Sequence, residues 1–570
     1  MHKPPLESAI LLLERMRPTE WQRTLALAAC VGVTGALATL GFRAGLQLAE
    51  HLLYGPVGGL VEAAATLHWW ERLLVPCVGG LLAGLVLLLS QRLTKGAPHG
   101  DYMEAVVLGR GELHAGSSLL RALSSACSVV SGGAIGREGP MVQLAALTGS
   151  LLAGLRTMPV PRRRLLVACG AAAGLTTAYG TPIAGALFIA EIVLQSLATE
   201  TLGALLITSV TAHVTVLALV GSAALYQMPR IAAPDAPAFL LCAALGLLAG
   251  LGAPLYLAVL DRAKKAFAAW HASLPLKLAV GGLAVGLLSL QAPQVWGNGF
   301  SVVNGVLQGP WAWQALLLVL VLKLAAIAAT TGSGAVGGIF TPTLFMGAVS
   351  GALFSLATQA LFAHPLPVPL GAAIGMGAFL AASSHAPLTS VLMIFEMTEN
   401  YSVVAPLMLA CVLAFSLSKL LRPESIYASS QKARAATDPR LATARELLHT
   451  GSPTVQPGDS VEKVETRLLE SRWRHVYVVD AHGRFLGAIA LHDLAVLLKA
   501  PHDAAAPWPA ALLQPNYPRL KQDMPLWDVL EVFEAHPGER LPVLDEAGVL
   551  QGHVAKTDLV LMLRDRLAVS

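Results

Sequence analysis

The sequence predicts a polytopic all-α membrane domain, built as an internal repeat with broken helices, followed by a C-terminal α/β pair. Three observations lead to this fold class: an apolar composition, a repeat within the apolar part, and a second repeat after about Ser430. The chain of 570 residues is 55% hydrophobic and 13% charged, with a mean hydropathy of +0.62. These values lie outside the balance of soluble globular proteins, so the lipid bilayer is the expected surrounding.

Apolar stretches recur from about Leu25 to about Leu421, roughly ten to fourteen of them at the ~20 residues that a spanning helix needs. Several are too short, or too interrupted by Gly and Pro, to span simply. The net charge of +4 does not suggest nucleic acid as a partner. The six cysteines lie in apolar runs without a CxxC pair, which favours buried thiols over a metal site or a disulfide framework.

The N-terminal segment has no continuous apolar core with a small-residue cleavage site, so we do not interpret it as a cleaved signal peptide. Its basic residues Lys3, Arg15, Arg17 and Arg23 favour a cytoplasmic start. We therefore expect a cytoplasmic segment (1–20) and then the membrane domain (21–430).

The membrane domain contains an ordered internal repeat. One set of residues recurs 202 positions later, and a second set recurs 205 positions later. The first set is Arg121/Lys323, Ser131/Ser333, Gly132/Gly334, Gly136/Gly338, Pro140/Pro342 and Gly149/Gly351; the second is Pro182/Pro387, Ile189/Ile394 and Glu191/Glu396. Paired Gly- and Pro-interrupted segments in two halves of a membrane protein indicate broken helices that meet near the midplane, where a solute binds.

Two of these segments, GREGP (136–140) and GGIFTP (337–342), are typical of helix starts within the membrane. Proline is tolerated in the first helical turn, and the glycines before it permit a sharp turn. Each start has free N–H groups that carry roughly half a positive charge. Two such ends that converge in a low-dielectric region form an anion site and repel cations.

Glu138 lies at the first of these starts, inside an apolar stretch. Its carboxylate is an anion that can take the place of a permeant anion, and it would move aside when that anion arrives or when a proton neutralises it. Glu138 is therefore our candidate gate. The alternative is an acid that only stabilises the helix dipole.

The polar part after residue 430 contains two copies of one unit, expected at 431–505 with its linker and at 506–570. Three pairs of residues recur 65 positions apart: Asp480/Asp545, Gly487/Gly552 and Asp493/Asp558. Each copy is predicted to form a strand, a turn, a second strand and a helix that its last Asp opens.

GREGP, TTGSGAVGGIFTP and the tyrosine of RPESIYASS together resemble the CLC chloride channels and proton-coupled chloride exchangers. The two C-terminal copies resemble a CBS pair, and DYMEAV (101–106) is similar to a bacterial subgroup described as voltage-gated chloride channels. The resemblance covers nearly the whole chain. It implies an inverted-repeat architecture for the membrane domain and a homodimer with one pore per subunit. It also implies a location in the bacterial inner membrane, with the N-terminus and the CBS pair in the cytoplasm.

The resemblance also assigns roles to individual residues. Glu138 matches the gating glutamate, and Tyr427 matches a tyrosine whose hydroxyl closes the anion site from the cytoplasmic side; its alternative is an interfacial aromatic anchor. The residues that match the family's anion-binding segments are Gly136, Arg137, Gly139, Gly338, Ile339 and Phe340. Arg121 and Lys323 match basic residues near the pore, with pairing to a buried acid, such as Glu104 for Arg121, as the alternative.

Two departures from the family pattern bear on mechanism. Pro98 stands where the family's first anion motif has a serine, and the resemblance links proline there to nitrate preference, so chloride selectivity is open. Ile192 replaces the second acid that passes protons in well-studied exchangers, which favours a channel, although some exchangers lack that acid.

A third departure concerns the CBS pair. Ala490 and Ala555 replace the Ser or Thr that often contacts an adenine nucleotide. Asp493 and Asp558 remain as candidate ribose ligands, with helix capping as the alternative. We expect no other cofactor and no metal.

The function expected from the sequence is a voltage-gated chloride channel, and the alternative is a proton-coupled chloride or nitrate exchanger on the same scaffold. An intramembrane hydrolase that uses Ser333 is disfavoured, because no GxSG-type elbow with a partner histidine is apparent, and we expect no enzyme. A nucleotide sensor is a further class, and it predicts adenine-nucleotide binding by the segment from Ser430 onward.

Overall fold

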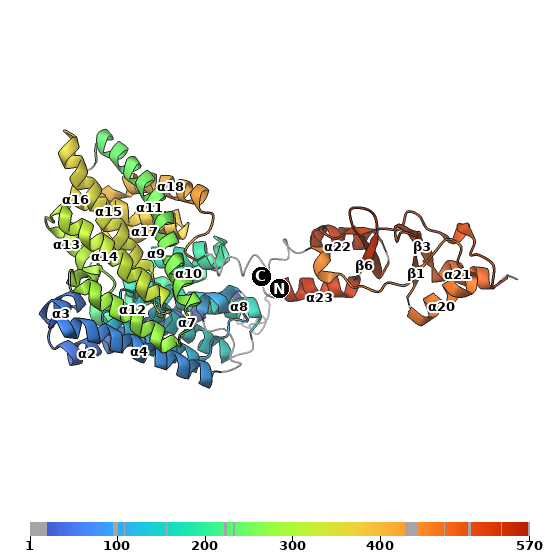
Figure 1. Cartoon of the computed structure of the whole chain (residues 1–570), viewed down its shortest axis with the longest axis horizontal. Helices are drawn as coiled ribbons and strands as arrows, with labels where there is room; N and C mark the ends of the chain where they lie inside the picture. The colour runs from blue at the N-terminus through green and yellow to red at the C-terminus, as the bar shows by residue number, and fades with distance from the viewer. Residues whose placement is uncertain are drawn as a thin grey trace, which may run out of the picture. The chain divides into compact units, whose positions relative to one another are not determined.

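The computed structural model describes residues 20–94, 101–107, 109–155, 158–221, 225–231, 234–427, 443–471, 473–499, 503–536 and 538–567. The chain divides into two compact units, Met1–Gln431 and Lys432–Ser570. The described part of the first, the membrane unit, is helical, whereas the second, the C-terminal unit, combines strands and helices (Figure 1). The predicted fold class, an all-α membrane domain with a C-terminal α/β pair, is confirmed.

The described part of the membrane unit contains both short and long helices. They are α2 (Glu20–Tyr54), α3 (Leu60–Thr66), α4 (Trp69–Leu93), α5 (Tyr102–Val107), α6 (Ala115–Val130), α7 (Glu138–Gly154), α8 (Val160–Tyr179), α9 (Pro182–Phe188), η1 (Ile189–Leu194), α10 (Thr199–Val220), α11 (Ala236–Ala269), α12 (Leu274–Ser289), η2 (Pro293–Val295), α13 (Phe300–Gln308), α14 (Trp313–Gly332), α15 (Phe340–Leu361), α16 (Val368–Ser384), α17 (Pro387–Thr398), η3 (Tyr401–Val403) and α18 (Val404–Leu421). Among the described residues, seven helical spans are long and apolar enough to cross a membrane, and four further apolar helices are shorter. This mixture explains why the apolar stretches alone suggested a larger number of spans.

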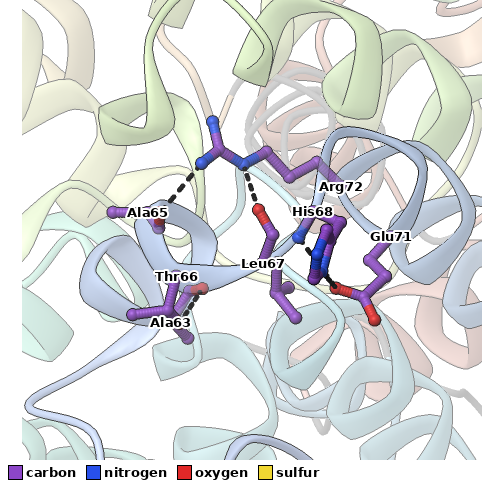
Figure 2. Close-up of polar contacts among 7 residues, drawn as sticks. All are labelled: Ala63, Ala65, Thr66, Leu67, His68, Glu71 and Arg72. Atoms are coloured by element: carbon purple, nitrogen blue, oxygen red, sulfur yellow. Dashed lines mark hydrogen bonds and ion pairs between the residues drawn. The ribbon is translucent and has the colours of Figure 1, made fainter.

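At the break between α3 and α4, side chains form hydrogen bonds with backbone groups that the helix ends leave unpaired (Figure 2). His68 occupies the N-cap of α4, and its backbone N–H donates to Glu71 Oε2 at 2.8 Å. Arg72 extends from α4 across the end of α3, where Nε donates to Leu67 O at 3.1 Å and Nη2 donates to Ala65 O at 2.9 Å. The guanidinium thus satisfies carbonyls that the broken helix would otherwise leave unpaired.

The sequence repeat is also a repeat of packing. A Cβ atom on Gly149 of α7 would lie 2.2 Å from Leu166 O of α8, and one on Gly351 of α15 would lie 2.0 Å from Gly371 O of α16. Both helix pairs therefore approach through a glycine at the same position of each half, at a separation that leaves no room for a side chain.

The expectation of buried thiols is confirmed for part of the set. All six cysteines are free; Cys169, Cys242 and Cys411 are buried, Cys77 and Cys127 are half-buried, and Cys30 is exposed.

The C-terminal unit contains two three-stranded sheets of the same design. The first orders β1 (Thr454–Val455), β2 (His475–Val479) and β3 (Phe485–Ala490), and the second orders β4 (Leu520–Lys521), β5 (Arg540–Leu544) and β6 (Leu550–Ala555). In each sheet the first pair is parallel, the second is antiparallel, and the register shifts within the antiparallel pair. The helices are η4 (Ala444–Leu447), α20 (Val461–Ser471), α21 (Leu491–Leu498), η5 (Ala510–Leu512), α22 (Leu526–Ala535) and α23 (Lys556–Leu567).

An aromatic cluster surrounds His553 on β6. Its ring stacks on His449, with centroids 5.4 Å apart, and meets the edge of Trp473 at 4.4 Å. Its Nδ1 lies 3.1 Å from Ser452 Oγ. Burial, together with the nearby His449 and Arg540, lowers the pKa of His553 to about 4.

We predict that Gly351→Ala destabilises the membrane unit by about 1–3 kcal/mol, because the added methyl group meets the backbone of α16 and overpacks the contact. Thermal unfolding of purified protein in detergent measures the loss. Gly41→Ala on α2 is the matched control, because nothing lies within 4 Å of a Cβ atom there. Equal melting temperatures for the two variants would contradict this packing account.

The C-terminal unit is predicted to lose stability as the pH falls from about 6.5 to about 4. The folded state lowers the pKa of His553 below its unfolded value of 6.5, so the neutral ring stabilises the fold and protonation removes that contribution. Hydrogen exchange of β5 and β6 in the full-length protein, corrected for the intrinsic rate at each pH, measures the loss.

His553→Phe keeps the ring stacking but cannot titrate, so it should flatten the larger part of this pH dependence. His475 and His536 also have lowered pKa values because of burial, and they account for the remainder. An unchanged slope in His553→Phe would refute the assignment to His553.

Candidate functional site

The candidate site begins with a reciprocal pair of backbone hydrogen bonds between the two halves. Gly136 N–H donates to Gly338 O at 2.7 Å, and Gly338 N–H donates to Gly136 O at 2.9 Å. These residues are 202 positions apart, so they are equivalents in the repeat. An antiparallel bridge between equivalent residues relates the two segments by a twofold axis, as an inverted repeat requires.

Two helices start directly beyond this bridge. Their N-cap residues are Arg137 for α7 and Ile339 for α15, and neither supplies a side-chain cap. The two starts are in close contact, since a Cβ atom on Gly139 would lie 3.2 Å from Gly338 N. The first-turn N–H groups of two helices are therefore gathered in one place, which favours negative charge there.

Glu138 lies at this junction and is 5% exposed. Its Oε1 accepts from Thr341 Oγ1 at 2.5 Å and from Asn298 Nδ2 at 3.4 Å. Its Oε2 has no hydrogen-bond partner among the described residues. This oxygen faces the glycine bridge, because a Cβ atom would lie 1.8 Å from it on Gly136 and 3.1 Å from it on Gly338.

A small pocket adjoins the carboxylate, with room for about one water-sized particle. Besides Glu138 and Thr341, its polar lining includes Arg137, Tyr179 and Asn298. The structure thus places both Glu138 and Arg137 at a pocket, and it adds polar residues that the sequence did not single out.

A row of aromatic rings continues from the α15 start. Phe340 contacts Tyr179, with centroids 4.9 Å apart, and Phe188, at 5.9 Å. Phe188 in turn meets Tyr427 edge-on at 5.7 Å. Phe340 and Tyr427 therefore belong to one row with Phe188 between them, and no motif in the sequence pointed to Phe188.

Lys323 is a fully buried residue of α14 that contacts the segment leading to Asn298. Its Nζ donates to Val295 O at 2.7 Å, Trp296 O at 3.3 Å and Gly297 O at 2.7 Å. The alternative that Lys323 pairs with a buried acid is therefore wrong, because three backbone carbonyls hold the ammonium group. Its repeat equivalent Arg121 is half-buried in α6, and the role of Arg121 stays a prediction.

Glu191 and Glu396 each cap the N-terminus of a helix in the opposite half of the repeat. Glu191 Oε2 accepts from the backbone N–H of Thr389, at 2.9 Å, and from its hydroxyl, at 2.5 Å, in the first turn of α17. Glu396 accepts from the N–H groups of Ile183, at 3.0 Å, and Ala184, at 2.8 Å, in the first turn of α9. Both acids therefore stabilise a helix start of the opposite half, as their recurrence in the repeat suggested.

Of the two departures from the family pattern in the membrane unit, Ile192 and Pro98, the structure describes only Ile192. Ile192 lies in η1 and is 5% exposed, so its position next to Glu191 holds a buried aliphatic group. Pro98 lies outside the described residues, so its expected role stays a prediction.

In the C-terminal unit, the two candidate ribose ligands are engaged by side chains of the opposite repeat. Asp493 Oδ2 accepts from Gln514 Nε2 at 2.9 Å, and Asp558 Oδ2 lies 2.8 Å from His449 Nε2. The N-cap of α21 is Ala490 and Asp493 is the third helical residue, so the capping alternative is wrong for Asp493. Nucleotide binding stays a prediction.

Comparison with known proteins agrees with this architecture. The family model described as voltage gated chloride channel matches residues 78–419, and the CBS domain model matches residues 444–500 and 510–565. The chain is 52% identical over 409 residues to a putative chloride channel protein, ClcB-like, of Ralstonia nicotianae, which covers 71% of this chain and 95% of the relative. It is 42% identical over 410 residues to the voltage-gated ClC-type chloride channel ClcB of Escherichia coli, which covers 71% and 98%.

Solved structures show the same fold. A slow cyanobacterial Cl⁻/H⁺ antiporter matches with a TM-score of 0.63 at 26% identity, over 72% of this chain and 98% of that one. A eukaryotic CLC transporter matches with a TM-score of 0.62 at 19% identity, over 94% and 98%. The chain is a multi-pass membrane protein and belongs to the voltage gated chloride channel (CLC) family, with a C-terminal pair of CBS domains.

Proposed function

We propose that this protein is a gated chloride channel of the bacterial inner membrane, in which Glu138 closes a pore in each subunit of a homodimer. The observation that carries the proposal is the position of one carboxylate between two helix starts, in contact with the glycine bridge that joins them. A negative group is favoured at this point, and a permeant anion meets the same requirement as the carboxylate.

Opening follows from competition for that place. When a proton neutralises Glu138, or when an arriving anion displaces it, the first-turn N–H groups of α7 and α15 become available to the anion. Backbone amides of Ile339 and Phe340 then form the central binding segment, while the N–H of Gly338 stays in the bridge to Gly136. Tyr427 closes the far end of the aromatic row. A cation gains nothing at such a site, since both helix dipoles present their positive ends.

Ile192 supports a channel rather than an exchanger. A buried aliphatic side chain cannot carry a proton, and a proton-coupled cycle needs a proton route to the gate from the other side of the membrane. The ClcB relative of Escherichia coli is itself named a voltage-gated chloride channel. The alternative, a proton-coupled exchanger, has support from the likeness to the cyanobacterial antiporter.

Voltage enters the proposal through movement of charge. An elementary charge that crosses the whole membrane field changes in energy by about 2.3 kcal/mol per 100 mV. Displacement of the Glu138 carboxylate, or of an anion, across part of that field therefore biases the open state.

We place the N-terminus and the CBS pair on the cytoplasmic side, in accord with the basic N-terminal residues.

For the gate, we predict that Glu138→Gln raises chloride flux at neutral pH severalfold and removes most of its pH dependence, because the amide carries no charge to hold the pore closed. Chloride efflux from proteoliposomes, measured across a pH series, tests this. A wild-type pH profile in Glu138→Gln would rule out the gating role.

Coupling is tested by recording proton movement in the same proteoliposomes. If the protein is a channel, an imposed chloride gradient drives no uphill proton transport in the wild type. Sustained uphill transport would establish the exchanger instead.

Parallel runs with nitrate, on the wild type and on Pro98→Ser, show whether Pro98 sets the anion preference. We expect the serine variant to shift that preference toward chloride.

A further inference from the structure

The shortest polar contact of Glu138 belongs to a chain of hydroxyl groups. Thr341 Oγ1 lies 2.5 Å from Glu138 Oε1, and Tyr179 Oη lies 3.0 Å from Thr341 Oγ1. A carboxylate can only accept, so the single Thr341 hydroxyl proton points to Glu138. The Tyr179 hydroxyl must then donate to Thr341, which fixes the direction of the chain.

All three groups are withdrawn from solvent: Tyr179 is 4% exposed, Thr341 is 2% exposed and Glu138 is 5% exposed. Tyr179 is the last residue of α8, and its ring packs on Phe340 at the start of α15. Thr341 is the second residue of α15. The chain therefore links the first half of the repeat, which supplies Glu138 and Tyr179, to the second half, which supplies Thr341.

We propose that Thr341, oriented by Tyr179, is the latch that holds the ionised Glu138 carboxylate in the closed position. The latch rests on the proposed gating role of Glu138 and extends it to two positioning residues. A hydroxyl–carboxylate hydrogen bond is charge-assisted and strong in a low-dielectric site, whereas a protonated carboxyl group is a weaker acceptor. The latch therefore favours the closed, ionised state and sets how much acid is needed to open the gate.

Other groups also face the carboxylate. Arg137, next to it in the chain, attracts its negative charge, and Arg137 also acts electrostatically on Arg43 and Glu50 of α2. Tyr226 also senses the charge of Glu138, but its hydroxyl has no hydrogen-bond partner among the described residues.

Asn298 is the other hydrogen-bond donor to Oε1, at the longer distance of 3.4 Å. The short bond from Thr341 is thus the contact most sensitive to whether the carboxylate is charged.

The test measures chloride efflux from proteoliposomes from about pH 4 to about pH 8 for a set of variants. Thr341→Val keeps the shape of the side chain but removes the hydroxyl group, and we expect the half-maximal flux to move about one pH unit upward. Thr341→Ser keeps a hydroxyl and should restore the wild-type profile. Tyr179→Phe leaves Thr341 unoriented and should move the profile in the same direction by a smaller amount.

Thr343→Val is the matched control, since Thr343 is a buried residue of the same helix whose hydroxyl donates to Ile339 O at 2.7 Å and not to Glu138. Its pH profile should stay at the wild-type position. Elution of each variant as a single peak in detergent establishes that it is folded. If Thr341→Val does not fold, Tyr179→Phe carries the test alone.

Wild-type pH profiles in Thr341→Val and Tyr179→Phe would overturn the latch, whereas pH-independent flux in Glu138→Gln would still support the gate. A pH-dependent Glu138→Gln would overturn the gate itself, so the two failures are distinguishable. In a Glu138→Gln background, Thr341→Val should cause no further pH shift, because no carboxylate remains to be held.

Discussion

The reciprocal hydrogen bonds between Gly136 and Gly338 are the constraint on which the site depends. They hold two helix N-termini against each other, and each end carries roughly half a positive charge. Like charges held together in a low-dielectric interior repel, so this junction is stable only with a negative group beside it. The fold thus requires a negative group beside the two helix N-termini. Either the Glu138 carboxylate or a permeant anion can be that group, and gating is the exchange of one for the other.

The buried Lys323 does not compete for that role, because its Nζ donates to three carbonyl oxygens of residues 295–297. Trp296 of the same segment packs on Gly132, where a Cβ atom would lie 2.4 Å from the indole ring. Lys323 therefore holds residues 295–297 in place directly before Asn298, and Asn298 donates to Glu138. Besides supplying a basic group, Lys323 thus positions a hydrogen-bond donor of the site.

Several parts of the site that the sequence predicted obey the repeat. Gly136 and Gly338 recur at one offset, as do Glu191 and Glu396 at another, and each of these pairs joins the two halves in the structure. Such positions can be found because backbone geometry and helix capping impose the same residue types twice. The alternative of an acid partner for Lys323 was wrong, because backbone carbonyls satisfy its amino group and leave no signal in the sequence.

The residues that were missed are those that break the repeat. Thr341 corresponds to Gly139 in the first half, and Tyr179 corresponds to Ser384 in the second. Their contacts also join positions far apart in the chain, so neither periodicity nor local spacing marks them. Glu138, which the sequence did identify, also breaks the repeat, because its equivalent is Phe340. This asymmetry has a physical reason. A symmetric site would place two carboxylates at one junction, where their mutual repulsion would raise the cost of ionising the second. With one carboxylate and one aromatic ring, a single charge can meet the requirement of both helix starts, and a single protonation or displacement releases it.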